Sequence, residues 1–165
     1  MRDLIRIVEN ASMLSESVAK VVNYLRFNGE DVDPRDAQAA LNAVQFLKRS
    51  PTEIYRVMRL TDSALAQIQP GSALGIYWST EQEIPKEHLF ADSTGEWYLF
   101  TAIVKPKSID IAGTAGARLL NQIEKGWEDE SEVRLLKGSP LLLQSIQDES
   151  GNHVREDLNN TPFIA

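Results

Sequence analysis

The chain has 165 residues, of which 42% are hydrophobic, enough for one compact domain with a buried core. Its formal net charge of −7 disfavours general nucleic-acid binding, because neutralising phosphates requires a surplus of lysine and arginine on at least one face, although local basic patches stay open. It contains no cysteine, which excludes disulfides, thiolate catalysis and cysteine-ligated metals and is typical of a reducing compartment.

Histidine spacing and hydropathy exclude two further classes of protein. His88 and His153 lie far apart and have no histidine neighbour at ligand spacing, so we expect no metal site. No stretch of 18 residues is continuously apolar, and the N-terminus mixes charges into its apolar positions. We therefore expect a soluble protein without a membrane partner, in the cytoplasm of the producing cell or of a target cell.

The first fifty residues space their apolar side chains as helices do, which predicts a helical hairpin. One helix is expected over residues 3–27, ended by Asn28-Gly29. A second should begin at Pro34, capped by Asp33, and end before Ser50-Pro51. We expect this pair to be a scaffold for the rest of the chain, not a separate binding module.

After residue 51 the chain is rich in β-branched and aromatic residues, which predicts strands. Short helices are expected at "SALAQIQ", capped by Thr61 or Asp62, and at "AGARLLNQIEKG", and a hairpin turn at 148–151. We thus expect one α+β domain, with a helical subdomain over 1–50 and a β-rich core over 51–165. The expected strands are 53–60, 73–79, 96–104, 108–112, 130–137 and 140–147.

The first of these strands carries an arginine on an apolar face. Alternation places Arg56 with Ile54 and Met58, and Tyr55 on the opposite side. A guanidinium there needs an anion, supplied either by a carboxylate of the protein or by a phosphate of a ligand. On this strand alone the internal pair is the preferred interpretation, because buried charges are usually paired.

Two further segments carry polar groups suited to chemistry on a sugar. The second strand ends in Tyr77-Trp78-Ser79-Thr80, whose hydroxyls can bond a ribose or orient a carboxylate, although for this segment alone a plain Ser-Thr turn is the preferred interpretation. Glu130 and Glu132 should share one strand face about 6.5 to 7 Å apart. Such a pair suits cleavage of a C–N glycosidic bond through an oxocarbenium-like state.

In this order, the aromatic-Arg pair, the Ser-Thr segment and Glu-x-Glu resemble the arginine, Ser-Thr-Ser, Glu-x-Glu class of mono-ADP-ribosyltransferases, the clostridial binary-toxin and phage enzymes in particular. The resemblance covers about residues 53–147. It implies an ADP-ribosyltransferase-like fold, with N-terminal helices against two facing, mostly antiparallel sheets and an NAD cleft between them. It also implies transfer of ADP-ribose from NAD, as co-substrate, to a protein acceptor, with release of nicotinamide.

The resemblance assigns the NAD-binding residues. Tyr55 and Arg56 match the aromatic-Arg pair, which implies that Arg56 binds the NAD diphosphate and the adjoining ribose. Ser79 and Thr80 match the first two residues of Ser-Thr-Ser, which implies that Ser79 positions the catalytic glutamate. Glu81 stands in place of the third residue of that motif.

The resemblance also assigns the two acids. Glu132, followed by Val133 and Lys137-Gly138, would bind the hydroxyl of the nicotinamide ribose. Glu130 would engage the acceptor, and a glutamate at this place goes with arginine as the acceptor in the family. Glu128 and Glu130 form an alternative Glu-x-Glu pair, but Val133 opens the apolar strand directly after the later pair.

Three questions stay open at the level of sequence. Trp127 could stack on a substrate or cover the edge of the core. A catalytically inert relative, with Arg56 paired to Glu132, would serve only to bind a protein partner. An RNA acceptor is disfavoured, because the acidic chain does not obviously supply a basic channel despite four lysines, at positions 105, 107, 125 and 137.

Overall fold

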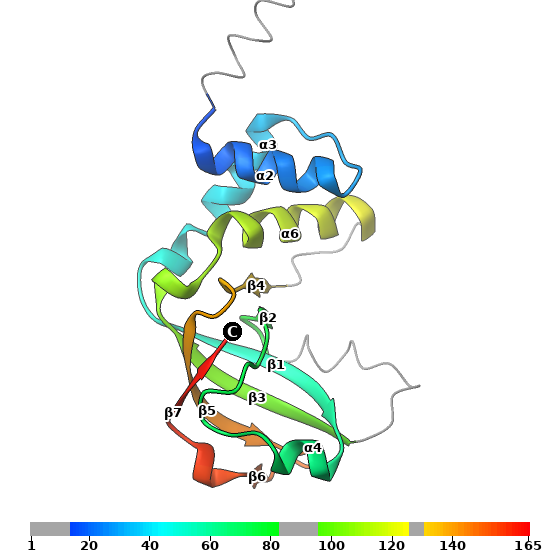
Figure 1. Cartoon of the computed structure of the whole chain (residues 1–165). Helices are drawn as coiled ribbons and strands as arrows, with labels where there is room; N and C mark the ends of the chain where they lie inside the picture. Colours follow the sequence, from blue (N-terminus) through cyan, green and yellow to red (C-terminus); the bar gives the residue numbers. More distant parts are fainter. Residues whose placement is uncertain (1–13, 83–95, 126–130) are drawn as a thin grey trace, which may run out of the picture. The chain divides into compact units, whose positions relative to one another are not determined.

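The computed structural model describes residues 14–82, 96–125 and 131–165, and it divides into two compact units (Figure 1). The helical unit comprises Met1–Gln45 and Ile111–Glu128, and the sheet unit comprises Phe46–Asp110 and Asp129–Ala165. The division differs from the expected subdomains over 1–50 and 51–165, because the long central helix belongs with the N-terminal helices. In the described ranges no helix is long and apolar enough to cross a membrane.

Three helices pack on one another in the helical unit: α2 (Glu16–Phe27), α3 (Pro34–Ala43) and α6 (Ile111–Lys125). Ser15 caps α2 by accepting from the Val18 amide at 3.3 Å, and Asp33 caps α3 by accepting from the Arg35 amide at 2.8 Å. The predicted hairpin is confirmed in its two helices, although α3 ends at Ala43, short of the expected end before Ser50-Pro51, and residues 3–13 lie outside the described residues. The buried apolar side chains within these three helices are Val18, Val21, Val22, Leu25, Ala37, Leu41, Ala115, Ala117 and Leu120.

Helix α6 begins earlier than predicted, which makes the expected strand over 108–112 wrong. Pro106–Ser108 is the 3₁₀ helix η2, Ile109 makes a single bridge to Leu135, and the chain enters α6 at Ile111. The alternating isoleucines of this segment suit a strand, but the pairing ends after one bridge. The buried Ile109 therefore anchors the connection without extending a ladder.

Seven strands form one open antiparallel sheet in the described part of the sheet unit. Its order is β4-β2-β1-β3-β5-β6, with β7 also pairing β5. The α+β class and the antiparallel pairing are as predicted. The strands are β1 (Thr52–Leu60), β2 (Tyr77–Ser79), β3 (Glu96–Val104), β4 (Glu132–Arg134), β5 (Pro140–Gln147), β6 (His153–Val154) and β7 (Thr161–Ile164).

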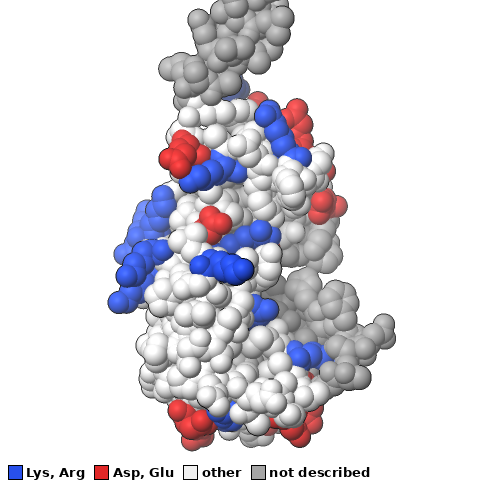
Figure 2. Space-filling model, in the orientation of Figure 1, with Lys and Arg blue, Asp and Glu red and all other residues white. Residues whose placement is uncertain are grey.

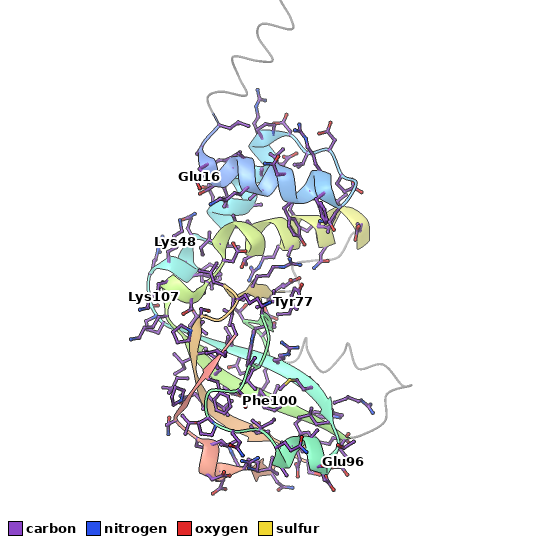
Figure 3. All side chains as sticks on the ribbon, in the orientation of Figure 1. Glu16, Lys48, Tyr77, Glu96, Phe100 and Lys107 are labelled. Carbon is purple, nitrogen blue, oxygen red and sulfur yellow. The ribbon has the colours of Figure 1, made fainter. Side chains whose placement is uncertain are left out.

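The expectation of two facing sheets is corrected by the pairing of β2. This strand lies between β1 and β4 and pairs with both, so it joins the early and late strands into one sheet. The buried side chains on the face that carries Ile54 and Trp78 include Phe100, Val133 and Ile146. Figure 3 shows Phe100 in the middle of this sheet.

Two strands are shorter than predicted because residues with positive φ interrupt them. Gly75 has a φ of 86°, and only Tyr77–Ser79 of the predicted strand 73–79 is paired as β2, with Ala73 making one isolated bridge to Ile164. Ser131 has a φ of 53°, and β4 begins after it.

The short connecting elements agree in part with the sequence. Helix α4 (Asp62–Ala66) is capped by Thr61, whose hydroxyl accepts from the Ala64 amide at 3.2 Å, as predicted. The hairpin turn at 148–151 is also confirmed, since Asp148 accepts from the amides of Ser150 and Asn152. The 3₁₀ helix η1 (Gln45–Lys48) stands where the expected second helix was to end, whereas strands β6 and β7 and the 3₁₀ helix η3 (Glu156–Leu158) were not expected.

Candidate functional site

Three of the sequence-predicted residues form a row across three neighbouring strands. Tyr55 of β1 pairs with Ser79 of β2, and Ser79 pairs with Glu132 of β4. Directly opposed residues of paired strands point to the same face, so the three side chains share one face of the sheet. The fold thus places Ser79, which is buried, directly beside Glu132.

The carboxylate of Glu132 is held by an arginine of its own strand. Arg134 Nε donates to Glu132 Oε1 at 2.9 Å, and the two side chains are 22% and 20% exposed. The Arg134 guanidinium lies over the ring of Tyr77, 5.0 Å from its centroid. Tyr77, labelled in Figure 3, pairs with Arg134 across β2 and β4. Sequence reasoning missed this pair, although two charges two residues apart on a strand share a face.

The segment after β2 is tied to the residue that precedes β4. The Ser79 hydroxyl accepts from the Glu81 amide at 3.0 Å, and Ser131 Oγ donates to Glu81 Oε1 at 2.8 Å. The amide of Thr80 donates to the Ser131 carbonyl at 2.9 Å, and its hydroxyl donates to the same oxygen at 3.3 Å. Glu81, which departs from the Ser-Thr-Ser pattern, therefore helps to join the hydroxyl segment to the Glu-x-Glu segment.

Arg56 lies on the other face of β1, with Ile54, as strand alternation predicts. Its guanidinium packs against Gly75, where a Cβ atom would lie 3.0 Å from Arg56 Cζ. The indole of Trp78 donates to the Gly75 carbonyl at 2.8 Å and holds this backbone in place. The close approach of side chain and backbone depends on the absence of a Cβ at Gly75.

The Arg56 guanidinium lacks an anion within the described ranges. Its Nη1 atom is buried and makes no hydrogen bond there, and burial lowers the pKa of the group. Glu132 bonds Arg134 instead, so the internal Arg56–Glu132 pair is not formed. A buried guanidinium nitrogen without an acceptor is unfavourable, because desolvation of a charged donor is uncompensated.

The hydroxyl of Tyr55 forms a hydrogen bond within its own strand, β1. It donates to the carboxylate of Glu53, and this hydrogen bond, aided by partial burial and by the charge of Glu53, raises the pKa of Tyr55 to about 12. Tyr55 therefore contributes its ring to the row with Ser79 and Glu132, while the hydroxyl is directed along β1.

Other predicted features lie outside the described residues or away from the row. Glu130 and Trp127 belong to the first group, and regular strand alternation does not extend back from Glu132 through Ser131. A hollow of about 230 Å³ lies between β3 and the 148–151 turn and contains none of the predicted site residues. Within the ranges that the structure describes, no group of three or more histidine and carboxylate side chains could hold a metal ion.

Comparison with known proteins adds no further constraint. No family model, curated protein or solved structure matches this chain.

Proposed function

We propose that this chain is an NAD-dependent mono-ADP-ribosyltransferase, which transfers ADP-ribose to a protein acceptor, arginine, and releases nicotinamide. The observation that carries the proposal is the half-buried Arg56 side chain, whose buried Nη1 atom has no hydrogen-bond acceptor in the described part of the chain. A diphosphate is the natural partner of such a group, because its oxygens accept paired hydrogen bonds from the planar guanidinium fork.

The register of β2 supports the role of Glu132 as the catalytic glutamate. A glutamate that stabilises an oxocarbenium-like ribose must be held in one orientation, and here Glu132 lies beside Ser79 and is bonded to Arg134. In the reaction, nicotinamide leaves with the electron pair of its C–N bond. A guanidinium nitrogen of the acceptor then bonds the ribose carbon and loses a proton. Glu130 would receive that proton, an assignment that remains a sequence prediction.

The proposal imposes a geometric requirement on bound NAD. Arg56 and Glu132 arise from opposite faces of the sheet, and the guanidinium lies against Gly75, ahead of β2, whereas Glu132 pairs with the last residue of β2. The diphosphate must therefore bind beside Gly75 on the face of Arg56, while the nicotinamide ribose must reach the opposite face at the other end of this short strand. Arg56→Lys, which keeps the charge but loses the fork, should weaken NAD binding.

Nicotinamide release from NAD tests the proposed reaction. Glu132→Gln should lower the rate by about 10²–10³-fold with little change in NAD affinity, because it removes charge needed in the transition state. Glu156→Gln, at an exposed position of η3, is the matched control and should behave as wild type. Adding agmatine, a small guanidine, should increase release and yield ADP-ribosylated agmatine.

The alternative, an inert domain that binds a protein partner, gives a different pattern. The wild-type chain would then release no nicotinamide with or without agmatine, and Arg56→Lys would change thermal stability while NAD affinity stayed undetectable. A Glu132→Gln variant that retained wild-type turnover would overturn the catalytic assignment directly.

A further inference from the structure

We propose that one end of the sheet unit, where β1 begins and β3 ends, binds the phosphodiester backbone of single-stranded nucleic acid. The surface, called the basic patch below, consists of Lys48, Arg49, Lys105, Lys107 and Lys137, all of them exposed. This inference is independent of the proposed reaction. None of the five residues belongs to the row of Tyr55, Ser79 and Glu132, and none forms a hydrogen bond or ion pair with Arg56.

Strand pairing and loop hydrogen bonds bring the patch residues together. The pairing of Thr52 with Val104 places the end of η1, with Lys48 and Arg49, beside the segment that begins at Lys105. The Leu136 amide donates to the Ser108 carbonyl at 2.9 Å, which places the neighbouring Lys137 beside Lys107.

The figures show the same gathering of positive charge. Lys48 and Lys107 are labelled at one edge of the molecule in Figure 3, and Figure 2 shows a group of blue side chains at that edge. Three segments that are distant in the sequence, at residues 48–49, 105–107 and 137, therefore present their cations from one end of the sheet unit.

The patch cations carry no internal counterions in the described part of the chain. Some cations in other parts of the chain do form ion pairs, such as Lys20 with Glu16 at 2.7 Å and Arg155 with Asp157 at 3.0 Å. None of the five patch residues forms such a pair with a described carboxylate, and Glu53 at the start of β1 accepts instead from the Tyr55 hydroxyl. Unpaired like charges repel one another, and a bound polyanion would relieve that repulsion.

Exposed apolar side chains beside the cations favour nucleic acid over an acidic protein surface. Phe46 is 46% exposed on η1, and the Arg49 amide donates to its carbonyl at 3.1 Å, which places Phe46 and Arg49 on one side of this 3₁₀ turn. An aromatic ring beside phosphate-binding cations stacks on an unpaired base, which a duplex does not offer. The ligand class is therefore a single strand.

Fluorescence anisotropy with a labelled oligouridylate and an oligothymidylate, in the absence of NAD, tests the inference. Wild-type protein should bind both, with log K falling against log salt with a slope of about −2 to −3.5 if three to five phosphates are neutralised. Lys107→Glu/Lys137→Glu should weaken binding at least tenfold and flatten that slope. Arg35→Glu, an exposed charge reversal on α3, is the matched control and should bind as wild type.

A second variant separates stacking from charge. Phe46→Ala should weaken binding several-fold while the salt slope stays that of wild type, because it removes a stacking surface and no cation. Absence of binding at low salt, equal weakening in Arg35→Glu, or equally tight binding of polyglutamate would overturn the proposal, the last in favour of an acidic protein partner. None of these results bears on nicotinamide release, so this proposal and the proposed reaction fail separately.

Discussion

Gly75 has a conformation and a neighbour that both require glycine. Its φ of 86° is disfavoured for other residues, and the Arg56 guanidinium occupies the place of a Cβ atom. Gly75→Ala should therefore destabilise the protein by about 1–2 kcal/mol through the backbone alone, and further through displacement of Arg56. If the proposed function holds, NAD affinity should fall as well.

Gly71→Ala is the matched control for this prediction. Gly71 has a φ of 83°, but nothing lies within 4 Å of the place of its Cβ, so its substitution reports the backbone contribution alone. Urea unfolding of the two variants should show a larger loss for Gly75→Ala. Equal losses would mean that the Arg56 contact contributes nothing.

The hydrogen bond between Tyr55 and Glu53 predicts that the stability of the fold falls at alkaline pH. The folded-state pKa of Tyr55 is raised to about 12, above the usual value of about 10. The hydrogen bond therefore stabilises the fold fully below pH ~10, and the stabilisation is lost as the pH rises through the folded pKa. Ultraviolet titration of tyrosinate should show a late transition, from which Tyr55→Phe removes one tyrosine and Glu53→Gln moves one to lower pH, while Tyr98, whose pKa burial also raises, stays late. An unchanged curve in Glu53→Gln would contradict the assignment.

The residues of the candidate site differ in how far the sequence predicts them. The placement of Arg56 on the apolar face of β1 follows from strand alternation, and the structure confirms it. The pairing of Glu132 with Arg134 could also have been predicted, because residues two apart on one strand share a face. The role of Gly75 is hidden, since a glycine gives no sign in the sequence of which side chain will lie against it.

At the scale of elements, Gly116 determines how closely α6 approaches α2. A Cβ atom there would lie 2.6 Å from Tyr24 Cδ1. Gly116→Ala should therefore destabilise the helical unit by about 1–3 kcal/mol, because the two helices or the ring must move. Removing the ring should relieve the clash, so Gly116→Ala should be nearly neutral in a Tyr24→Ala background. Thermal unfolding of the four proteins of this cycle checks the prediction, which additive losses would contradict.

The long, regular elements are the ones that the sequence predicts well. Strands β3 and β5 agree with the predicted 96–104 and 140–147, because each contains a run of apolar residues, with aromatics in β3, and pairs along most of its length. Strand β2 is cut short by the conformation of Gly75, and β6 and β7 are short strands whose pairing depends on β5 being already in place. Local propensity carries little information about pairs of this kind.

At the scale of the whole molecule, composition conceals the distribution of charge. A net charge of −7 argues against binding a polyanion only if charges are mixed evenly, whereas the fold collects five cations from separate segments at one edge. The sequence also does not reveal that α6 groups with the N-terminal helices. Residues 111–125 follow β3 and η2 in the sequence, and only the packing of their apolar side assigns them to the helical unit.

The pairing of β2 has a consequence for local unfolding. β1 and β3 are paired through nine consecutive residue pairs, whereas β2 contributes one residue pair to β1 and three to β4. Amide hydrogens of β2 and β4 should therefore exchange with solvent deuterium well before those in the middle of β1 and β3, because opening the short strands disrupts few contacts. Glu132 would then lie in a weakly protected ribbon of the sheet. A ligand that binds this ribbon would slow its exchange selectively and leave the β1–β3 amides unchanged.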